Sequence, residues 1–315
     1  MQDKRVIVTG GAGFVGSHIC EKLCSLGYYV VIVDNLRSGD KGYVESLLRS
    51  GKAELVQENI CDIDAMRRVI KDAAYVFHEA AVGINYSIDH PQETLDINLI
   101  GSYNVFRAAL EAEVKKVVFA SSASVYGNAE YLPMDESHPF NPMTPYCVSK
   151  IGCEYLAKMF ARQGLKYIAL RYFNVYGLRQ SKSAFYTSVI NIFVKSIKQG
   201  VPPTIFGDGT QSMDFINVKD VAEANILAME SKTENDVFNV ASGAETSIKE
   251  LAEMILKSMK SDLKPVYSKE RLIIVRHRQA SIDKIRKALK FEPRISLKEG
   301  LKELIRDVCE RPANY

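Results

Sequence analysis

A glycine motif directly after an apolar run constrains this chain more than any other feature. The segment 9–16 reads TGGAGFVG and carries glycines at positions 10, 13 and 16. Apolar residues precede it, and an amphipathic stretch follows. Glycine allows a tight turn and leaves no Cβ between the backbone and a diphosphate, while a helix amino terminus offers free N–H groups. The motif therefore predicts a strand, a dinucleotide-binding loop and a helix in that order.

The end of the second expected strand indicates which dinucleotide is bound. This strand, at 29–34, ends on Asp34, whose carboxylate can accept hydrogen bonds from ribose hydroxyls. The same charge repels a ribose phosphate, so NAD is favoured over NADP. Arg37 lies close enough in sequence to accommodate that phosphate and leaves NADP open. Asp62 follows the third strand and fits either the adenine amino group or the N-cap of the next helix.

Apolar runs alternate with amphipathic stretches through the first half of the chain. The Val-, Ile- and Phe-rich runs lack polar alternation, as in a parallel sheet buried on both faces. Strands are expected at 5–8, 29–34, 53–57, 75–78, 116–121 and 167–171, and helices at 13–25, 65–71, 91–112 and 145–162. The fold class is therefore α/β, a Rossmann-type doubly wound parallel sheet formed by residues 1–171.

The pattern changes after Arg171. Helices are expected at 186–199, 220–230, 247–259, 283–289 and 297–309. We expect residues 172–315 to form mainly a smaller, mostly helical substrate domain over the carboxyl ends of the strands. Segments near 214–240 are expected to return to the main sheet, through a strand at 237–240. Residues 82–87 are expected to form a mobile loop.

A tyrosine and a lysine lie four residues apart on one expected helix. Tyr146 and Lys150 therefore share a face, and the ammonium would favour the phenolate, so that the phenol can act as a base. Ser121 and Ser122 end the fifth strand, at the sheet edge where such folds bind ligands. A serine hydroxyl there can hydrogen-bond a reacting oxygen beside the tyrosine.

Composition excludes several other classes of protein. The net charge of +3 is spread along 315 residues, which argues against nucleic acid as a partner. No signal peptide and no apolar stretch of about 18 residues is present, so no membrane partner is expected. The six cysteines lack CxxC spacing and the five histidines are scattered. We therefore expect no metal site, and reduced thiols in a cytoplasmic protein.

Several motifs together resemble one family over almost the whole chain. They are TGGAGFVGSH, VDNLRSG, HEAA (78–81), SSASVYG (121–127), PYCVSK (145–150), RYFNVYG (171–177) and PPTIFGDGTQSMDFINVKDV (202–221). The chain resembles the extended short-chain dehydrogenase/reductases, specifically the nucleotide-sugar epimerases typified by UDP-glucose 4-epimerase. The resemblance implies an isomerase that inverts C4 of a UDP-hexose, UDP-glucose or UDP-galactose in the first instance, through a transient 4-keto sugar with retained NAD. It also implies a homodimer built on the helices at 91–112 and 145–162.

The resemblance assigns roles residue by residue. It makes Tyr146 the catalytic base, Lys150 its partner and Ser122 the hydroxyl that binds the sugar. The residues implied for NAD are Gly10, Gly13, Phe14, Val15, Gly16, Asp34, Asn35, Arg37, Ser38, Gly39, Asp62, Ile63, Ala80, Ala81, Asn98, Tyr146, Lys150 and Tyr172. The residues implied for the nucleotide sugar are Ser122, Tyr146, Asn174, Thr187, Val189, Thr204, Phe206, Gln211, Arg271 and Arg276.

Two departures from the family pattern leave the sugar open. Met213 stands where relatives usually carry arginine, and Ser281 where aspartate is common. Another UDP-sugar, such as UDP-glucuronate or UDP-N-acetylglucosamine, therefore stays in view. Ala123 and Ser124 stand where 4,6-dehydratases place acidic residues, and decarboxylating relatives usually carry a glutamate there. A non-catalytic NAD-sensing regulator is a further alternative, although such proteins usually lose the tyrosine or the lysine.

Overall fold

A seven-stranded parallel sheet forms the centre of the molecule. The computed structural model describes residues 4–180, 189–269 and 276–310. The strand order is β10-β6-β5-β4-β1-β2-β3, and every pair in it is parallel. The bounds are β1 Arg5–Thr9, β2 Tyr29–Val33, β3 Ala53–Val56, β4 Tyr75–His78, β5 Lys116–Ser122, β6 Tyr167–Tyr172 and β10 Asp236–Val240. The doubly wound α/β class is confirmed, and the strand expected at 237–240 joins this sheet.

Both faces of the sheet are buried because successive side chains point to opposite sides. Val6 and Val8 belong to one apolar core, and Ile7 between them belongs to a second core. The same alternation holds in β2, where Val31 packs into the second core and its neighbour Ile32 into the first. This two-sided burial explains why the strands read as continuous apolar runs.

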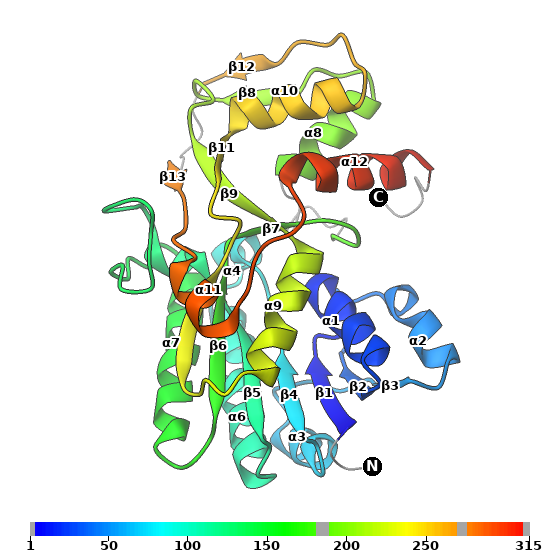
Figure 1. Cartoon of the computed structure of the whole chain (residues 1–315), viewed down its shortest axis with the longest axis vertical. Coiled ribbons are helices and arrows are strands. Elements are labelled where there is room, and N and C mark those ends of the chain that lie inside the picture. Colours follow the sequence, from blue (N-terminus) through cyan, green and yellow to red (C-terminus); the bar gives the residue numbers. More distant parts are fainter. Residues whose placement is uncertain (1–3, 181–188, 270–275, 311–315) are drawn as a thin grey trace.

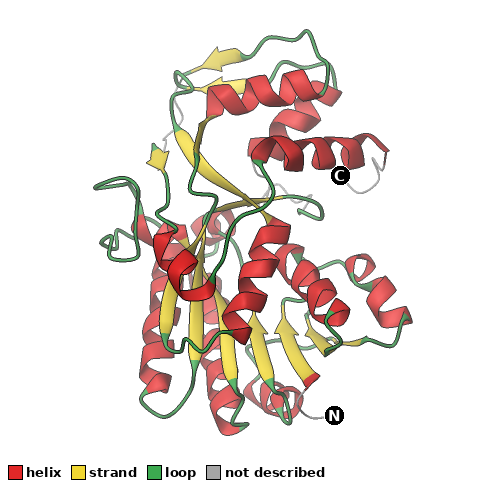
Figure 2. Cartoon of the chain, viewed as in Figure 1, coloured by secondary structure: helices red, strands yellow, loops and turns green. Residues whose placement is uncertain are grey.

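Helices cover each face of the sheet (Figures 1 and 2). The first core takes side chains from α1, α2, α9 and α11, and the second core from α3, α6 and α7. The bounds on the first side are α1 Phe14–Ser25, η2 Lys41–Tyr43, α2 Glu45–Arg49, α9 Val218–Glu230 and α11 Asp283–Leu289. The bounds of the remaining elements of this layer are α3 Ile63–Ile70, α4 Ile84–Asp89, α5 Pro91–Leu95, η3 Asp96–Ile100, α6 Gly101–Glu111, η4 Ala123–Tyr126 and α7 Pro145–Ala161.

A second, smaller layer lies beyond the carboxyl ends of the strands (Figure 1). Strands β7, β9, β11 and β13 form one small sheet, and β8 pairs with β12. Helices α8, α10 and α12 pack on them around a third apolar core. The bounds are β7 Asn174–Tyr176, α8 Val189–Lys198, β8 Thr204–Phe206, β9 Ser212–Asn217, β11 Glu245–Ser247, α10 Ile248–Ser258, β12 Val266–Ser268, β13 His277–Arg278 and α12 Leu297–Glu310.

Some sequence predictions need correction. The segment 82–87, expected as a mobile loop, enters helix α4, which begins after Gly83. The helix expected over 91–112 is interrupted by a π-helical turn at η3. The short helices at 41–49 and the strands of the second layer were not predicted at all. The start of the helix expected at 186–199 lies outside the described residues.

The chain crosses between the two layers more than once. Helix α9 packs against α1, and α11 packs against β10 and α9, so residues well beyond 171 complete the first layer. We propose residues 1–171 as the bulk of one domain and 172–315 as the bulk of the other. Within the described residues, every helix is too short or too polar to cross a membrane.

Candidate active site

The glycine loop packs tightly against the end of β4. Gly10 has a φ of +68°, and a Cβ added to it would lie 2.7 Å from the Ala80 backbone nitrogen. A Cβ on Gly16 would lie 2.2 Å from the Gly10 carbonyl oxygen. Neither position can hold a side chain without moving backbone. Gly13 is the N-cap of α1, so the amino terminus of that helix opens at the loop.

A cavity of about 640 Å³ lies between this loop and the second layer. Such a volume is typical of a small-molecule site. Met213, Phe215 and Ile248 line it from the second layer. The predicted site residues that line it are Gly10, Gly13, Phe14, Val15, Gly16, Asp34, Asn35, Arg37, Ser38, Ala80, Ala81, Ser122, Tyr146, Lys150, Tyr172, Asn174 and Val189.

Asp34 lies at the end of β2 with both carboxylate oxygens held. Its Oδ2 accepts from the Ala12 N–H at 3.0 Å, and its Oδ1 accepts from the Leu36 N–H at 2.9 Å. Burial raises the pKa of Asp34 above its ordinary value. Gly39 packs beneath it, because a Cβ there would lie 2.8 Å from the carboxylate. The carboxyl group is thus fixed where a ribose would meet it.

Arg37, the residue that left NADP open, is engaged by protein groups. Its guanidinium forms an ion pair with Glu93 and donates a hydrogen bond to the Tyr86 hydroxyl. It also stacks 4.8 Å from the Tyr86 ring centre. A ribose phosphate would have to compete with the Glu93 carboxylate and would face Asp34 as well. These contacts favour NAD.

The cavity fits the dinucleotide that the sequence predicts. Gly13 lines it, and apart from its chain neighbours a Cβ placed on this residue would meet, among the described residues, just the Gly10 oxygen at 3.1 Å. That open space beside a helix amino terminus suits a diphosphate. Gly10, Asp34 and Ala80 lie around the same cavity, so the loop, the ribose carboxylate and the β4 end face one ligand.

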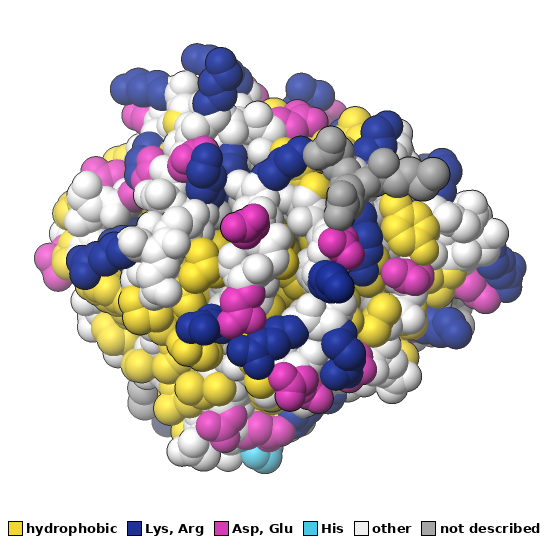
Figure 3. Space-filling view, turned by 90° about the horizontal axis from the view of Figure 1, so that it is seen from below, with side chains coloured by type: hydrophobic (Ala, Val, Ile, Leu, Met, Phe, Trp, Pro, Cys, Tyr) yellow, Lys and Arg dark blue, Asp and Glu magenta, His cyan; other side chains and the backbone are white. Residues whose placement is uncertain are grey.

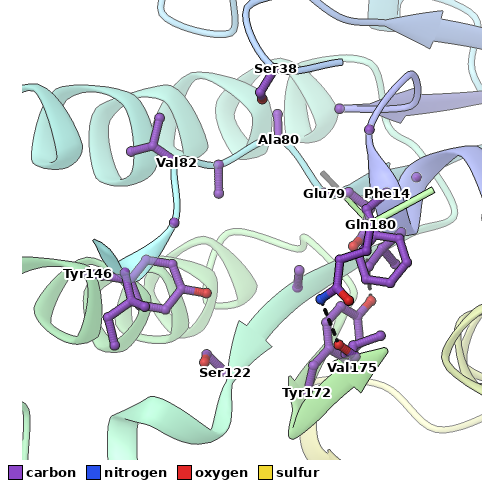
Figure 4. Close-up of a pocket in the computed structure, with 18 of the residues that line it drawn as sticks. Phe14, Ser38, Glu79, Ala80, Val82, Ser122, Tyr146, Tyr172, Val175 and Gln180 are labelled. Atoms are coloured by element: carbon purple, nitrogen blue, oxygen red, sulfur yellow. Dashed lines mark hydrogen bonds between the residues drawn. The ribbon is translucent and has the colours of Figure 1, made fainter. Parts of the chain in front are cut away.

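The catalytic candidates come together at the other end of the cavity (Figure 4). Helix α7 begins at Pro145, and Thr144 caps it by accepting a hydrogen bond from the Cys147 N–H. This cap places Tyr146 on the first turn and Lys150 one turn later. The Lys150 Nζ lies 5.7 Å from the centre of the Tyr146 ring. Figure 4 shows the Tyr146 hydroxyl pointing into the cavity on the same side as Ser122.

Backbone contacts hold the lysine and the serine in place. The Lys150 ammonium donates to the Ala120 carbonyl at 2.8 Å, which ties α7 to β5. The Ser122 Oγ accepts from the Ser124 N–H at 3.1 Å and leaves its own proton available as a donor. A phenol, an ammonium and a hydroxyl therefore belong to side chains that line one cavity. That arrangement can move a proton to and from a substrate oxygen.

Glu79 is a cavity residue that sequence reasoning did not single out. Its Oε1 accepts from the Tyr172 hydroxyl at 3.0 Å, and Asn225 donates to that hydroxyl at 2.7 Å. Burial raises the pKa of Glu79 to about 8. The HEAA motif indicated this strand end. The hydrogen bonds around the Glu79 carboxyl group, however, depend on Tyr172 and Asn225, which are far away in sequence.

Eight predicted residues do not line the cavity. Asp62 is the N-cap of α3 and accepts from the Asp64 and Ala65 N–H groups. The Asn98 Oδ1 accepts a hydrogen bond from the Val82 N–H, and the Asn98 Nδ2 donates to the Val82 carbonyl. Asn98 therefore holds the backbone of a residue that lines the cavity. The others are Gly39, Ile63, Thr204, Phe206, Gln211 and Arg276. Thr187 and Arg271 lie outside the described residues.

Known proteins share this architecture over the full length of the chain. A candidate UDP-glucose 4-epimerase of Methanocaldococcus jannaschii is 40% identical, covering 95% of this chain and 97% of the relative. A UDP-N-acetyl-alpha-D-glucosaminuronate decarboxylase of Bacillus cytotoxicus is 34% identical over 96% of this chain and 97% of its own. The solved UDP-N-acetylglucosamine 4-epimerase of Methanobrevibacter ruminantium, in complex with UDP-N-acetylmuramic acid, superposes with a TM-score of 0.93. It is 38% identical and covers 99% of this chain and 100% of its own.

The family assignment rests on the region that holds the cavity. Residues 6–241 match the model of the NAD dependent epimerase/dehydratase family. This range runs from β1 through β10 and so includes the whole main sheet, the glycine loop and the Tyr146–Lys150 pair. With a loop shaped for a diphosphate, a carboxylate placed for a ribose and a tyrosine–lysine pair beside them, the chain belongs to the NAD-dependent epimerase/dehydratase family.

Proposed function

We propose that the protein is a UDP-hexose 4-epimerase that inverts the sugar at C4 through a transient 4-keto sugar. The observation that carries this proposal is the meeting of Ser122, Tyr146 and Lys150 in one cavity with the glycine loop and Asp34. UDP-glucose and UDP-galactose are the reference substrate pair. The similarity to UDP-sugar 4-epimerases over the full chain supports the reaction class.

The residues of this chain handle the proton and the orientation of the sugar. The Tyr146 phenolate takes the proton of the sugar 4-hydroxyl as the C4–H bond breaks, and it returns that proton when C4 is reduced from the opposite face. Lys150 lies beside the Tyr146 ring, and Ser122 would hydrogen-bond the reacting oxygen. Bound NAD would supply hydride acceptance and return at C4.

The nucleotide would keep the ketone from escaping between the two half-reactions. We propose that Asn174 holds the sugar diphosphate, since it lines the cavity from β7. Thr204, Phe206, Gln211 and Arg276 belong to the second layer and are proposed to hold the nucleotide end, with Thr187, Val189 and Arg271. Binding energy from that remote part can tether the sugar while its ring turns over.

Three rival functions are less well supported. A 4,6-dehydratase must protonate a leaving hydroxide, but the residues after Ser122 are buried Ala123 and Ser124 and carry no carboxyl group. The same positions count against a uronate decarboxylase that uses a glutamate there. A non-catalytic sensor would not need Tyr146 and Lys150 together in the cavity. Analysis of the product for loss of water or of CO₂ separates these activities.

The test of the proposed function is Tyr146→Phe. This change should reduce epimerisation without added cofactor by about 10²- to 10⁴-fold, because the loss of the proton acceptor removes general base catalysis. The NAD released from the denatured protein should stay at the wild-type amount. Tyr29→Phe, at the far end of β2, is the matched control and should keep full activity. Substantial turnover by the Tyr146 variant would refute the assignment.

We also propose that the protein is a homodimer through α6 and α7. Val148, Tyr155 and Met159 are 49%, 58% and 40% exposed, and their spacing places them on one stripe of α7. Ile100 at the end of η3 and Tyr103 on the first turn of α6 add apolar surface. Hydrophobic side chains gather on one side of the molecule in Figure 3. Such a surface is typical of protein–protein contacts.

The oligomeric state can be measured directly by light scattering after size-exclusion chromatography. The wild type should elute as a dimer and Tyr155→Glu as a monomer, whereas Tyr267→Glu, an equally exposed site on β12, should stay dimeric. A dimeric Tyr155→Glu protein would place the interface elsewhere. We further propose a cytoplasmic location, which the six free cysteines support.

A further inference from the structure

Arg37 joins the two segments that flank the glycine loop at the carboxyl edge of the main sheet. It follows β2, whereas its partners Tyr86 and Glu93 lie on α4 and α5, which follow β4. Strand β1 lies between β2 and β4, and the glycine loop comes directly after β1. The two flanking strands are therefore two strand spacings apart, or about 10 Å. The Arg37 side chain bridges the gap between the segments that follow them.

The bridge is a closed set of contacts among three side chains. The Arg37 guanidinium forms an ion pair with Glu93 and donates a hydrogen bond to the Tyr86 hydroxyl, which in turn donates to Glu93. The guanidinium also lies 4.8 Å from the centre of the Tyr86 ring, a contact that stabilises a cation. Tyr86 is only 9% exposed and stacks on His90 at 4.3 Å. We refer to Arg37, Tyr86 and Glu93 as the clamp.

The clamp borders the cavity, but just one of its members faces the space inside. Arg37 lines the cavity together with Asp34, and Gly83 and Ile84 line it from the other side of β1. Neither Tyr86 nor Glu93 is among the described residues that line it. These two side chains can therefore influence a bound dinucleotide through Arg37, by holding two walls of the cavity together.

We propose that the clamp is a gate for NAD, which has to open before the cofactor can enter or leave the cavity. This inference goes beyond the proposed function, because it concerns the cofactor and is independent of the sugar. The contacts of the clamp involve protein groups alone, so it can close with or without NAD. A gate of this kind slows entry and exit by the same factor and leaves the dissociation constant unchanged. It would retain NAD from one turnover to the next.

Exchange of bound NAD in the intact protein tests the gate. Protein loaded with radiolabelled NAD is mixed with an excess of unlabelled NAD, and the label that remains on the protein is followed over time. Glu93→Ala should speed release by about 3- to 10-fold, as expected for the loss of an exposed ion pair and a hydrogen bond. Uptake of NAD by the stripped protein should speed up by the same factor. Glu93→Gln, which keeps a hydrogen-bond acceptor, should show a smaller effect.

Two further measurements separate a gate from a general loss of structure. Arg37→Gln combined with Glu93→Ala should release NAD no faster than Arg37→Gln alone, because both changes open the same clamp. High salt should speed release from the wild type but not from Glu93→Ala, since salt screens an exposed ion pair. The matched control is Glu45→Ala, which removes an exposed carboxylate paired with Arg49 on α2 and should leave the release rate unchanged.

Three results would overturn the inference. One is a wild-type release rate in Glu93→Ala protein that thermal unfolding shows to be folded. Another is a weaker dissociation constant with unchanged uptake, because the clamp would then contribute to affinity rather than act as a gate. The third is faster release in Arg37→Gln alone, which would assign the guanidinium to a direct contact with NAD. Failure to epimerise any UDP-hexose would refute the proposed function, while the exchange rates would still decide whether the clamp is a gate.

Discussion

The buried ion pair behind the catalytic helix leads to a quantitative prediction. Arg171 on β6 donates from Nε and Nη2 to the two carboxylate oxygens of Glu154 on α7, at 2.8 and 2.7 Å. The two side chains are only 4% and 2% exposed. Ser121 also donates to Glu154, at 2.6 Å. The pair therefore joins the catalytic helix to two strands of the sheet.

Glu154→Gln keeps the shape of the side chain and removes its charge. Leaving one member of a buried pair uncompensated costs about 3 to 5 kcal/mol. Scaled to 315 residues, the entropy of unfolding is about 0.7 kcal/mol per kelvin. The melting temperature should therefore fall by about 5 to 8 °C, as measured by differential scanning calorimetry on the cofactor-free protein.

The control for this prediction is an exposed pair of the same chemistry. Glu45 and Arg49 are 52% and 77% exposed, and Glu45→Gln should shift the melting temperature by less than about 1 °C. Glu154→Leu combined with Arg171→Met should recover part of the loss, because removing both charges leaves neither unpaired. If the melting temperature of Glu154→Gln falls no more than that of the Glu45→Gln control, the claim that this pair is buried and coupled is refuted.

Two further predictions concern the glycine loop and the cavity carboxyl group. Gly10→Ala should abolish NAD retention and lower the melting temperature. Gly51 has a positive φ too but open space around it, so the melting temperature of Gly51→Ala should fall only by the smaller amount that a positive φ costs alanine. Equal effects in the two variants would contradict the close packing of Gly10 on Ala80. For Glu79, burial raises the folded-state pKa from 4.5 to about 8, so the folded protein binds this proton more tightly than the unfolded chain. Titration of this carboxyl group therefore lowers the free energy of unfolding as pH rises from about 4.5 to about 8. The melting temperature of cofactor-free Glu79→Gln, relative to that of the wild type, should therefore be higher at pH 8 than at pH 5. The same difference in melting temperature at both pH values would refute this pKa.

The first layer was predictable because its signals are local. The continuous apolar runs and the glycines at 10, 13 and 16 specify strand, loop and helix within short windows. Tyr146 and Lys150 also needed only their spacing on one expected helix. The predicted strands accordingly lie within one residue of the observed ends.

The helices α8, α10 and α12 of the second layer were expected, but its strands were missed because most of them are too short to show a period. β7, β8, β11 and β12 have three residues each, and β13 has two. Helix α4 follows Gly83, which provides no side-chain cap. The pairing of β13 with β9 sets Arg278 opposite Met213, 65 residues away along the chain, and no local pattern reveals it.

The edge strand β10 affects how the chain can fold while it is being synthesised. β6 is buried along its whole length, and β10, which pairs with it, ends at Val240. A nascent chain that has emerged only as far as residue 172 thus carries the tyrosine, the lysine and the glycine loop but exposes one side of β6. The ribosome must deliver nearly seventy more residues before that edge is closed, so fragments cut between the two layers should be aggregation-prone rather than half-active.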